Sequence, residues 1–328
     1  MGVHNVPSSY KTMINCLKRT SETARIGQYS FFCPVCNILN PTNEQCQNSE
    51  CSQHQKFQEP ILNTFFEFDI FQQIDQILSR EKCLTFPDHK LPSQQSPVTD
   101  ITNSSYYQKI MAEEKTKFIT LTMNVDGIGI ENKNETGIWV IMFIINEIKK
   151  KYRFKMNNAV FGGVWANKKK PKREHMGEMI RLIQQQLKKL ELGMVFTVKQ
   201  LGDQLTFIPV YLLAAACDKP AISLVQNTPE PNAGYGCSRC EMEGVTVYTG
   251  KTFIRVFPLF PGQSLLDTRR SNESYDKAMD LWDTQTSVLS KVKLKKFISQ
   301  TRGYLGQCHL RNLKYFDVGR FTVLFSQS

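Results

Sequence analysis

The 328-residue sequence has no apolar run long enough to cross a bilayer and no apolar segment at its N-terminus. Its two most apolar stretches, residues 137–145 and 205–217, fall short of the roughly 20 residues that a membrane-spanning helix needs. Residues 1–10 lack the apolar core of a secretory signal. We therefore expect no membrane partner, and we interpret both apolar stretches as buried strands.

Acidic residues are few compared with basic ones: 30 Asp and Glu stand against 41 Lys and Arg, which gives a formal charge of +11. Such a surplus favours a polyanionic partner, because Lys and Arg release counterions when they neutralise phosphates. A basic surface that is merely solvated would have the same composition. No internal repeat is visible, and the proportions of apolar and charged residues are those of a globular protein.

Four of the ten cysteines are clustered near the N-terminus, at Cys33, Cys36, Cys46 and Cys51. Without a secretory signal, clustered cysteines indicate a metal site more than a disulfide framework. Zinc takes four soft ligands in a tetrahedron, and two cysteine pairs on tight turns supply them. The spacing therefore predicts a structural zinc site, in which His54 could replace Cys51.

A second cysteine pair, Cys237 and Cys240, has only half of the ligands that zinc needs. Two glycines just before the pair suit a tight turn. Further ligands could come from Cys217, Cys308 or His309, and the sequence does not choose among them. The alternative is a pair of buried thiols.

The chain divides by composition into three segments. Residues 1–60 predict a short helix and a zinc-ribbon-like module, residues 61–115 a helix and a polar linker, and residues 116–328 the main domain. Within the main domain, apolar patterns predict three strands, a long helix, a fourth strand and a further helix. These elements are expected at residues 117–125, 137–145, 158–165, 176–190, 205–217 and from Pro220 onwards. This order predicts an α/β, ribonuclease-H-like mixed sheet with flanking helices.

Two aspartates, Asp126 and Asp218, are placed where the first and fourth predicted strands end. If these strands are neighbours in one sheet, the carboxylates converge at one edge. Such a pair can bind Mg²⁺ or Mn²⁺, and these ions activate water for phosphodiester cleavage. The alternative is that both aspartates simply terminate strands, with Asp218 capping the helix that follows.

A basic run occupies residues 168–173, between the third strand and the long helix. We interpret it as a DNA-facing loop, and a nuclear localisation signal or a solvated loop are the alternatives. Its candidate contacts to nucleic acid are Lys168, Lys169, Lys170, Lys172 and Arg173.

Six segments follow one another in an order that resembles the transposases of CACTA (En/Spm-like) elements from animal genomes. They are Leu121–Gly127, Ile138–Lys149, Arg153–Trp165, Ala216–Ala221, Gly234–Cys240 and Arg255–Pro258. The resemblance covers nearly the whole chain and is most specific over residues 117–258. It implies a ribonuclease-H-like core with an Asp, Asp, Glu triad that cuts and joins DNA with a divalent metal.

By this resemblance the first two members of the triad are Asp126 and Asp218, and Cys237 and Cys240 match the family's cysteine pair. The third member has no counterpart. Residues 310–318 resemble a family segment that precedes the catalytic Glu, but the sequence ends ten residues later. Four other glutamates, Glu230, Glu241, Glu243 and Glu273, are in the wrong context. We therefore expect a C-terminally truncated copy that does not carry out complete transposition.

The resulting expectation is a nuclear, zinc-containing, DNA-binding transposase fragment, and a second copy of the chain is left open as a further partner. Two alternatives remain: a non-enzymatic DNA or chromatin binder, and a relic without a selected role. Metal-dependent nicking of DNA would separate the transposase from the binder.

Overall fold

The computed structural model describes residues 27–57, 63–86, 99–129, 137–167, 170–259, 261–262, 264, 269–285 and 290–320. The short helix expected before the cysteines in residues 1–60, most of the polar linker expected in residues 61–115, and Lys168 and Lys169 lie outside these residues. No helix within the described ranges is both long and apolar enough to cross a membrane.

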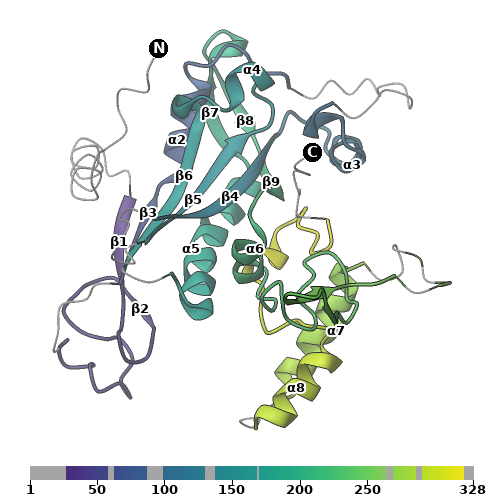
Figure 1. The fold of residues 1–328 in the computed structure, drawn as a ribbon. Helices are drawn as coiled ribbons and strands as arrows, with labels where there is room; N and C mark the ends of the chain where they lie inside the picture. The colour runs from purple at the N-terminus through teal and green to yellow at the C-terminus, as the bar shows by residue number, and fades with distance from the viewer. Residues whose placement is uncertain are drawn as a thin grey trace.

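A seven-stranded mixed sheet runs through the first two thirds of the chain, in the order β2-β1-β3-β6-β5-β4-β9 (Figure 1). Its strands are β1 (Gly27–Phe32), β2 (Leu39–Asn40), β3 (Thr64–Phe68), β4 (Ile119–Gly129), β5 (Gly137–Ile145), β6 (Ala159–Asn167) and β9 (Val210–Ala215). All neighbouring pairs are antiparallel except β4 and β9, which are parallel. The sheet takes strands from all three segments expected in the sequence, so it crosses both of the expected boundaries.

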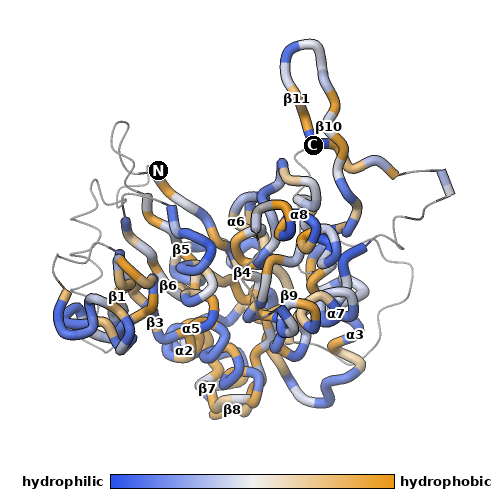
Figure 2. The backbone as a smooth tube through the Cα atoms, turned by 90° about the horizontal axis from the view of Figure 1, so that it is seen from below, coloured by the Kyte–Doolittle hydropathy of each residue, from blue (hydrophilic) through white to orange (hydrophobic). Residues whose placement is uncertain are grey.

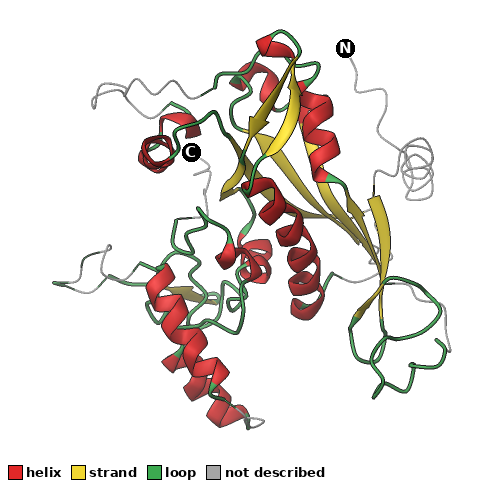
Figure 3. Cartoon of the chain, turned by 180° about the vertical axis from the view of Figure 1, so that it is seen from behind, coloured by secondary structure: helices red, strands yellow, loops and turns green. Residues whose placement is uncertain are grey.

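Helices α2 (Ile70–Leu78), α5 (Arg173–Glu191) and α6 (Lys219–Val225) pack on one face of this sheet (Figure 3). Apolar side chains of α5 fall on one face of the helix and join alternate residues of β4 and β5 in the main core. In β4 these core residues are Ile119, Leu121, Met123 and Val125. Because strand side chains alternate, Thr122, Asn124 and Asp126 lie on the opposite face.

That opposite face is covered at one end by α3 (Ser105–Glu113), which packs on Tyr211 and Leu213 of β9. The buried carboxylate of Glu147 ties α3 to the sheet: it accepts hydrogen bonds from the hydroxyl of Tyr107 (2.9 Å) and from the backbone N–H of Thr120 (2.8 Å). Short elements flank this region, namely η1 (Ile101–Asn103), α4 (Lys150–Arg153) and η2 (Met156–Asn158).

Two expected strand ends are wrong. The apolar stretch at residues 205–217 forms two strands, β8 (Gln204–Ile208) and β9, because Pro209 between them has no N–H to continue a ladder. β8 pairs with β7 (Met194–Val198), a strand that the sequence pattern did not indicate, and η3 (Lys199–Leu201) connects them. β4 continues to Gly129 instead of ending at Asp126, since its pairing with β5 is unbroken to Gly137.

The remaining chain forms a helical part beside α6, with α7 (Asn272–Asp283), α8 (Lys291–Gln300) and η4 (His309–Asn312) (Figure 1). Strands β10 (Val245–Tyr248) and β11 (Phe253–Val256) form a hairpin that projects from this part (Figure 2). Gln226, at the end of α6, donates a hydrogen bond to the carbonyl of Val318 (3.0 Å), which joins the two parts.

Close packing of β3 on β6 depends on Gly163. A Cβ atom at this position would lie 2.2 Å from the ring of Phe65, whose side chain is fully buried. We expect Gly163→Ala to lower the free energy of unfolding by about 1–3 kcal/mol through overpacking. Urea denaturation measures this, with Gly137→Ala as the control, because a Cβ at Gly137 meets only the Trp139 ring, at 3.9 Å. Equal stability of the two variants would contradict the prediction.

Candidate functional site

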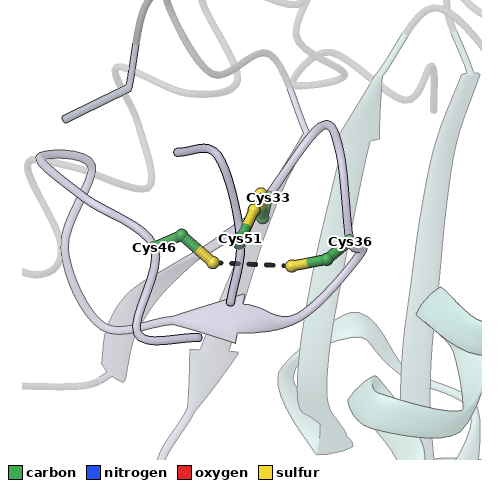
Figure 4. A group of neighbouring side chains, drawn as sticks. All are labelled: Cys33, Cys36, Cys46 and Cys51. Atoms are coloured by element: carbon green, nitrogen blue, oxygen red, sulfur yellow. Dashed lines mark hydrogen bonds between the residues drawn. The ribbon is translucent and has the colours of Figure 1, made fainter. Parts of the chain in front are cut away.

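The four N-terminal cysteines converge at the edge of the sheet, just beyond β1 (Figure 4). Their sulfur atoms all lie within 4.8 Å of one another. Sγ of Cys33 is 3.7 Å from that of Cys51, and Sγ of Cys36 is 3.4 Å from that of Cys46. Tetrahedral zinc with Zn–S bonds of about 2.3 Å would separate its sulfurs by roughly 3.8 Å. The four cysteines could therefore hold one metal ion, and their geometry is compatible with structural zinc.

Tight backbone turns bring the sulfurs together. The turn after β1 is closed by hydrogen bonds between the backbones of Cys33 and Ile38 (2.9 Å) and of Asn37 and Cys33 (3.0 Å). Asn37 adopts φ 59°, a left-handed conformation that Asn tolerates better than most residues. The second turn is closed between the backbones of Cys51 and Asn48 (3.0 Å).

His54 does not belong to the sulfur group. Its Nδ1 lies 2.8 Å from the backbone carbonyl of Cys46, so this nitrogen donates its proton to an acceptor within the turn. The geometry favours Cys51 over His54 as the fourth ligand.

Burial raises the pKa of Cys46 to about 12, whereas hydrogen bonds from the Ile38 backbone and the other thiols outweigh burial and lower the pKa of Cys36.

The cysteine turn is docked on the main core through a buried histidine. Nε2 of His175, in the first turn of α5, is 3.0 Å from Oδ1 of Asn37. The His175 ring also packs against the rings of Phe32 and Trp165, at centroid distances of 4.8 and 4.9 Å. The conformation of the cysteine turn therefore depends on how β1, β6 and α5 pack together.

Cys237 and Cys240 lie beside each other without a third ligand. Among the described residues, the N-terminal cysteines are the one group of three or more His, Cys, Asp or Glu able to share a metal, and it does not include this pair. The proposed partner Cys308 instead donates to the carbonyl of Val225. The hydrogen bond from Cys240, aided by the charge of Arg270, lowers the pKa of Cys237. The pair is thus a polarised dithiol.

The two aspartates have equivalent positions relative to the last pair of β4 and β9: Asp126 lies within β4, and Asp218 lies beyond the end of β9, at the start of α6. The last paired residues of β4 and β9 are Met123 and Ala215, and each aspartate comes three residues later. Both carboxylates are exposed, and the negative charge of both adds to burial in raising the pKa of Cys217 to about 12. A single buried thiol therefore lies within electrostatic reach of Asp126 and Asp218.

Local hydrogen bonds hold both carboxylates. Oδ1 of Asp218 accepts from the backbone N–H of Ala221 (2.7 Å), so this residue caps α6, as the alternative interpretation of the sequence expects. Oδ1 of Asp126 accepts from the N–H of Gly127 (2.8 Å). Within the part of the chain that the structure describes, no third His, Cys or carboxylate joins the two in a metal-binding group.

The basic loop leaves the sheet at the same end as the aspartates. The end of β6 is aligned with the start of β5, which in turn pairs with the end of β4. Lys172 is exposed, and Lys170 lies 3.5 Å from Glu230. Arg173 is used differently, since its guanidinium donates to the carbonyl of Ser223 (2.9 Å) and so joins α5 to α6.

Sequence inspection missed a second basic segment, residues 149–156. Its sequence, KKKYRFKM, interleaves lysines with aromatic residues, and this pattern was visible without a structure. Lys149, Lys150, Lys151 and Lys155 are exposed here, as is Phe154. Asn124, two residues before Asp126, was also missed because a lone Asn in a strand has no pattern.

We expect the purified chain to contain one zinc ion, which Cys46→Ser removes because three thiolates leave the tetrahedron open. Zinc content is measured with a chromogenic chelator after unfolding. Cys83→Ser is the matched control, as Cys83 lies outside the sulfur group. Because β1 and the cysteine turn share the core, chelation should also lower the melting temperature of the wild type. Loss of zinc in Cys83→Ser, or its retention in Cys46→Ser, would contradict the assignment.

Comparison with models of known protein families finds no match to this chain. Comparison with curated proteins finds no match either.

Proposed function

We propose that this chain is a DNA-binding protein with a ribonuclease-H-like, divalent-metal-binding core of the kind that CACTA-element transposases contain. The observation that carries the proposal is the parallel pairing of β4 with β9, which puts Asp126 and Asp218 at matching positions beyond the last strand pair. Two carboxylates at one sheet edge suit Mg²⁺ or Mn²⁺, which prefer oxygen ligands.

Sheet order and charge support the same proposal. Strands β6, β5 and β4 are consecutive antiparallel neighbours, and β9 then adds in parallel after the α5 crossover. The lysines at 170 and 172 precede α5, and they lie toward the same end of this sheet as Asp126 of β4 and Asp218 at the start of α6. DNA bound across that end would place a phosphodiester near the carboxylates while lysines neutralise the neighbouring phosphates. A nuclear location is proposed together with the DNA partner.

At such a site a divalent cation would activate water and stabilise the leaving oxygen. The protein's own contribution is to position the two carboxylates: the pairing of β4 with β5 holds Asp126 opposite Val140, and Asp218 caps α6. The cysteine cluster has a separate role, and we propose that it binds zinc structurally, because four protein thiolates leave no open position for substrate.

One observation favours non-enzymatic DNA binding as a second candidate. No third carboxylate joins Asp126 and Asp218 among the described residues, so two metal ions would lack a full ligand set. In this second candidate the protein still binds DNA and zinc, but it does not cleave DNA strands. Nicking of supercoiled DNA in Mn²⁺ separates the two candidates: nicking that Asp126→Asn abolishes supports the nuclease, and intact DNA supports the binder.

We expect zinc-loaded protein to bind Mn²⁺, and Asp126→Asn or Asp218→Asn to weaken this binding at least tenfold. Asn keeps each local hydrogen bond, including the α6 cap, so the loss would report charge alone. Electron paramagnetic resonance of free Mn²⁺ gives the affinity. Asp69→Asn is the matched control, because Oδ1 of Asp69 caps α2 in the same way by accepting from the Gln72 N–H (2.9 Å). Equal affinity in all four proteins would contradict a metal site here.

DNA affinity should fall steeply with salt, and Lys170→Ala with Lys172→Ala should reduce the slope of log K against log salt by about 2, since each phosphate contact contributes about 0.9. Fluorescence anisotropy of a labelled duplex measures the slope. Lys293→Ala with Lys295→Ala on α8 removes the same charge from exposed positions. Identical slopes in the two double variants would show that the loop does not contact DNA.

A further inference from the structure

A cavity of about 740 Å³ lies against the sheet face opposite α5, between α4 and the segment that contains η1. This volume is within the range of about 300–1,000 Å³ typical of small-ligand sites. Most of its wall is apolar, supplied by Met142 and Ile144 of β5, Ile101 of η1 and the ring of Phe154. The cavity takes no part in the carboxylate chemistry proposed above.

Two wall residues of the cavity lie close to the aspartates in the sequence. Asn124 lies two residues before Asp126, and Ala216 lies two residues before Asp218, and both line the cavity. The side chain of Asn124 donates to the Ala216 carbonyl, so the wall bridges β4 and β9 at this point. A strand of nucleic acid at the carboxylates therefore has this apolar cavity as its immediate neighbour.

The rim of the cavity is basic. Lys150 lines it, and Lys149, Lys151 and Lys155 extend from the same short segment and are exposed. Lys155 places its Nζ 4.6 Å from the centre of the Tyr152 ring. The segment from residue 149 to 156 contains no acidic residue.

The one carboxylate in the cavity wall is already neutralised. Asp100 accepts two hydrogen bonds from the guanidinium of Arg153, at 2.6 and 2.8 Å. The pairing with Arg153 outweighs burial and lowers the pKa of Asp100. The remaining charges at the rim are the positive charges of the lysines, so the mouth of the cavity is complementary to phosphate.

Phe154 supplies an accessible aromatic ring to the cavity wall. This residue is 64% exposed although it lines an apolar cavity, so part of its ring is accessible to a planar ligand. An apolar pocket beside lysines matches a nucleotide in which an unpaired base enters and the phosphates stay outside. Base stacking on an aromatic ring is worth about 1–3 kcal/mol and accepts any base.

We infer that this cavity binds one unpaired base of a nucleic-acid strand, stacked on Phe154, with the adjoining phosphates on Lys149, Lys150 and Lys151. The inference rests on the proposed function, because it needs a nucleic-acid partner, and it adds a preference for single-stranded or opened nucleic acid beside the carboxylates. An apolar side chain of a protein partner is the competing occupant, and it would give no base dependence.

The test compares two labelled 12-nucleotide strands with equal numbers of phosphates, one of thymidines and one of abasic sugars. In the wild-type chain we expect the thymidine strand to bind about tenfold more tightly. Phe154→Ala should reduce this ratio at least threefold, and Phe154→Trp should preserve it because the larger ring still stacks. Met156→Ala is the matched control, since Met156 is 76% exposed on the same segment but does not line the cavity.

The outcomes separate the inference from the proposed function. If the wild type binds neither strand and no duplex, both are overturned. If it binds both strands equally, or if Phe154→Ala leaves the ratio unchanged, DNA binding stands and the base pocket is overturned. A ratio that falls in Phe154→Ala and not in Met156→Ala establishes the pocket, because loss of folding would weaken both strands alike.

Discussion

Parallel hydrogen bonding between β4 and β9 is the constraint on which the candidate site depends. The two strands are separated by some 80 residues of chain, yet the ladder places the ends of both at one edge and in one register. Its last steps are irregular: after a bulge near Leu121, the Val125 N–H donates to the sulfur of Cys217 instead of to a carbonyl. Cys217 is part of the main core, whereas both carboxylates are exposed.

The cysteine cluster is joined to the same sheet and is not a free module. β1 runs directly into Cys33 and pairs along its length with β3, while Asn37 reaches His175 at the start of α5. Metal binding at the cluster would therefore order the turn that supports the N-terminus of α5. Since the basic loop leads into that helix, the cluster and the candidate DNA surface share a structural element.

Local patterns in the sequence were sufficient to predict the features that local interactions determine. β5 has the expected bounds, because eight apolar residues between Gly137 and Asn146 favour a buried strand, and the cysteine spacing located the four sulfurs that converge. The remaining features of the fold depend on contacts between residues that are distant in the sequence. Neither the β7–β8 hairpin nor the continuation of β4 past Asp126 follows from periodicity, since each depends on a partner strand. The polar residues Asn146 and Glu147, which resemble a strand terminus, are buried by partners on β4 and α3.

The two runs of basic residues show the same limit of prediction from sequence, in this case for the surface that could bind DNA. The run at 168–173 is the denser one, but Arg173 is used to join two helices and Lys170 lies near a glutamate. The run at 149–155 is interrupted by aromatic residues, and its one buried cation, Arg153, is paired with Asp100, while the lysines beside it are exposed. Whether a lysine is available to phosphate depends on which acidic residues the fold brings near it. By that criterion the exposed lysines at 149–155 are candidates to contact phosphate, and their segment lies along the cavity beside β4.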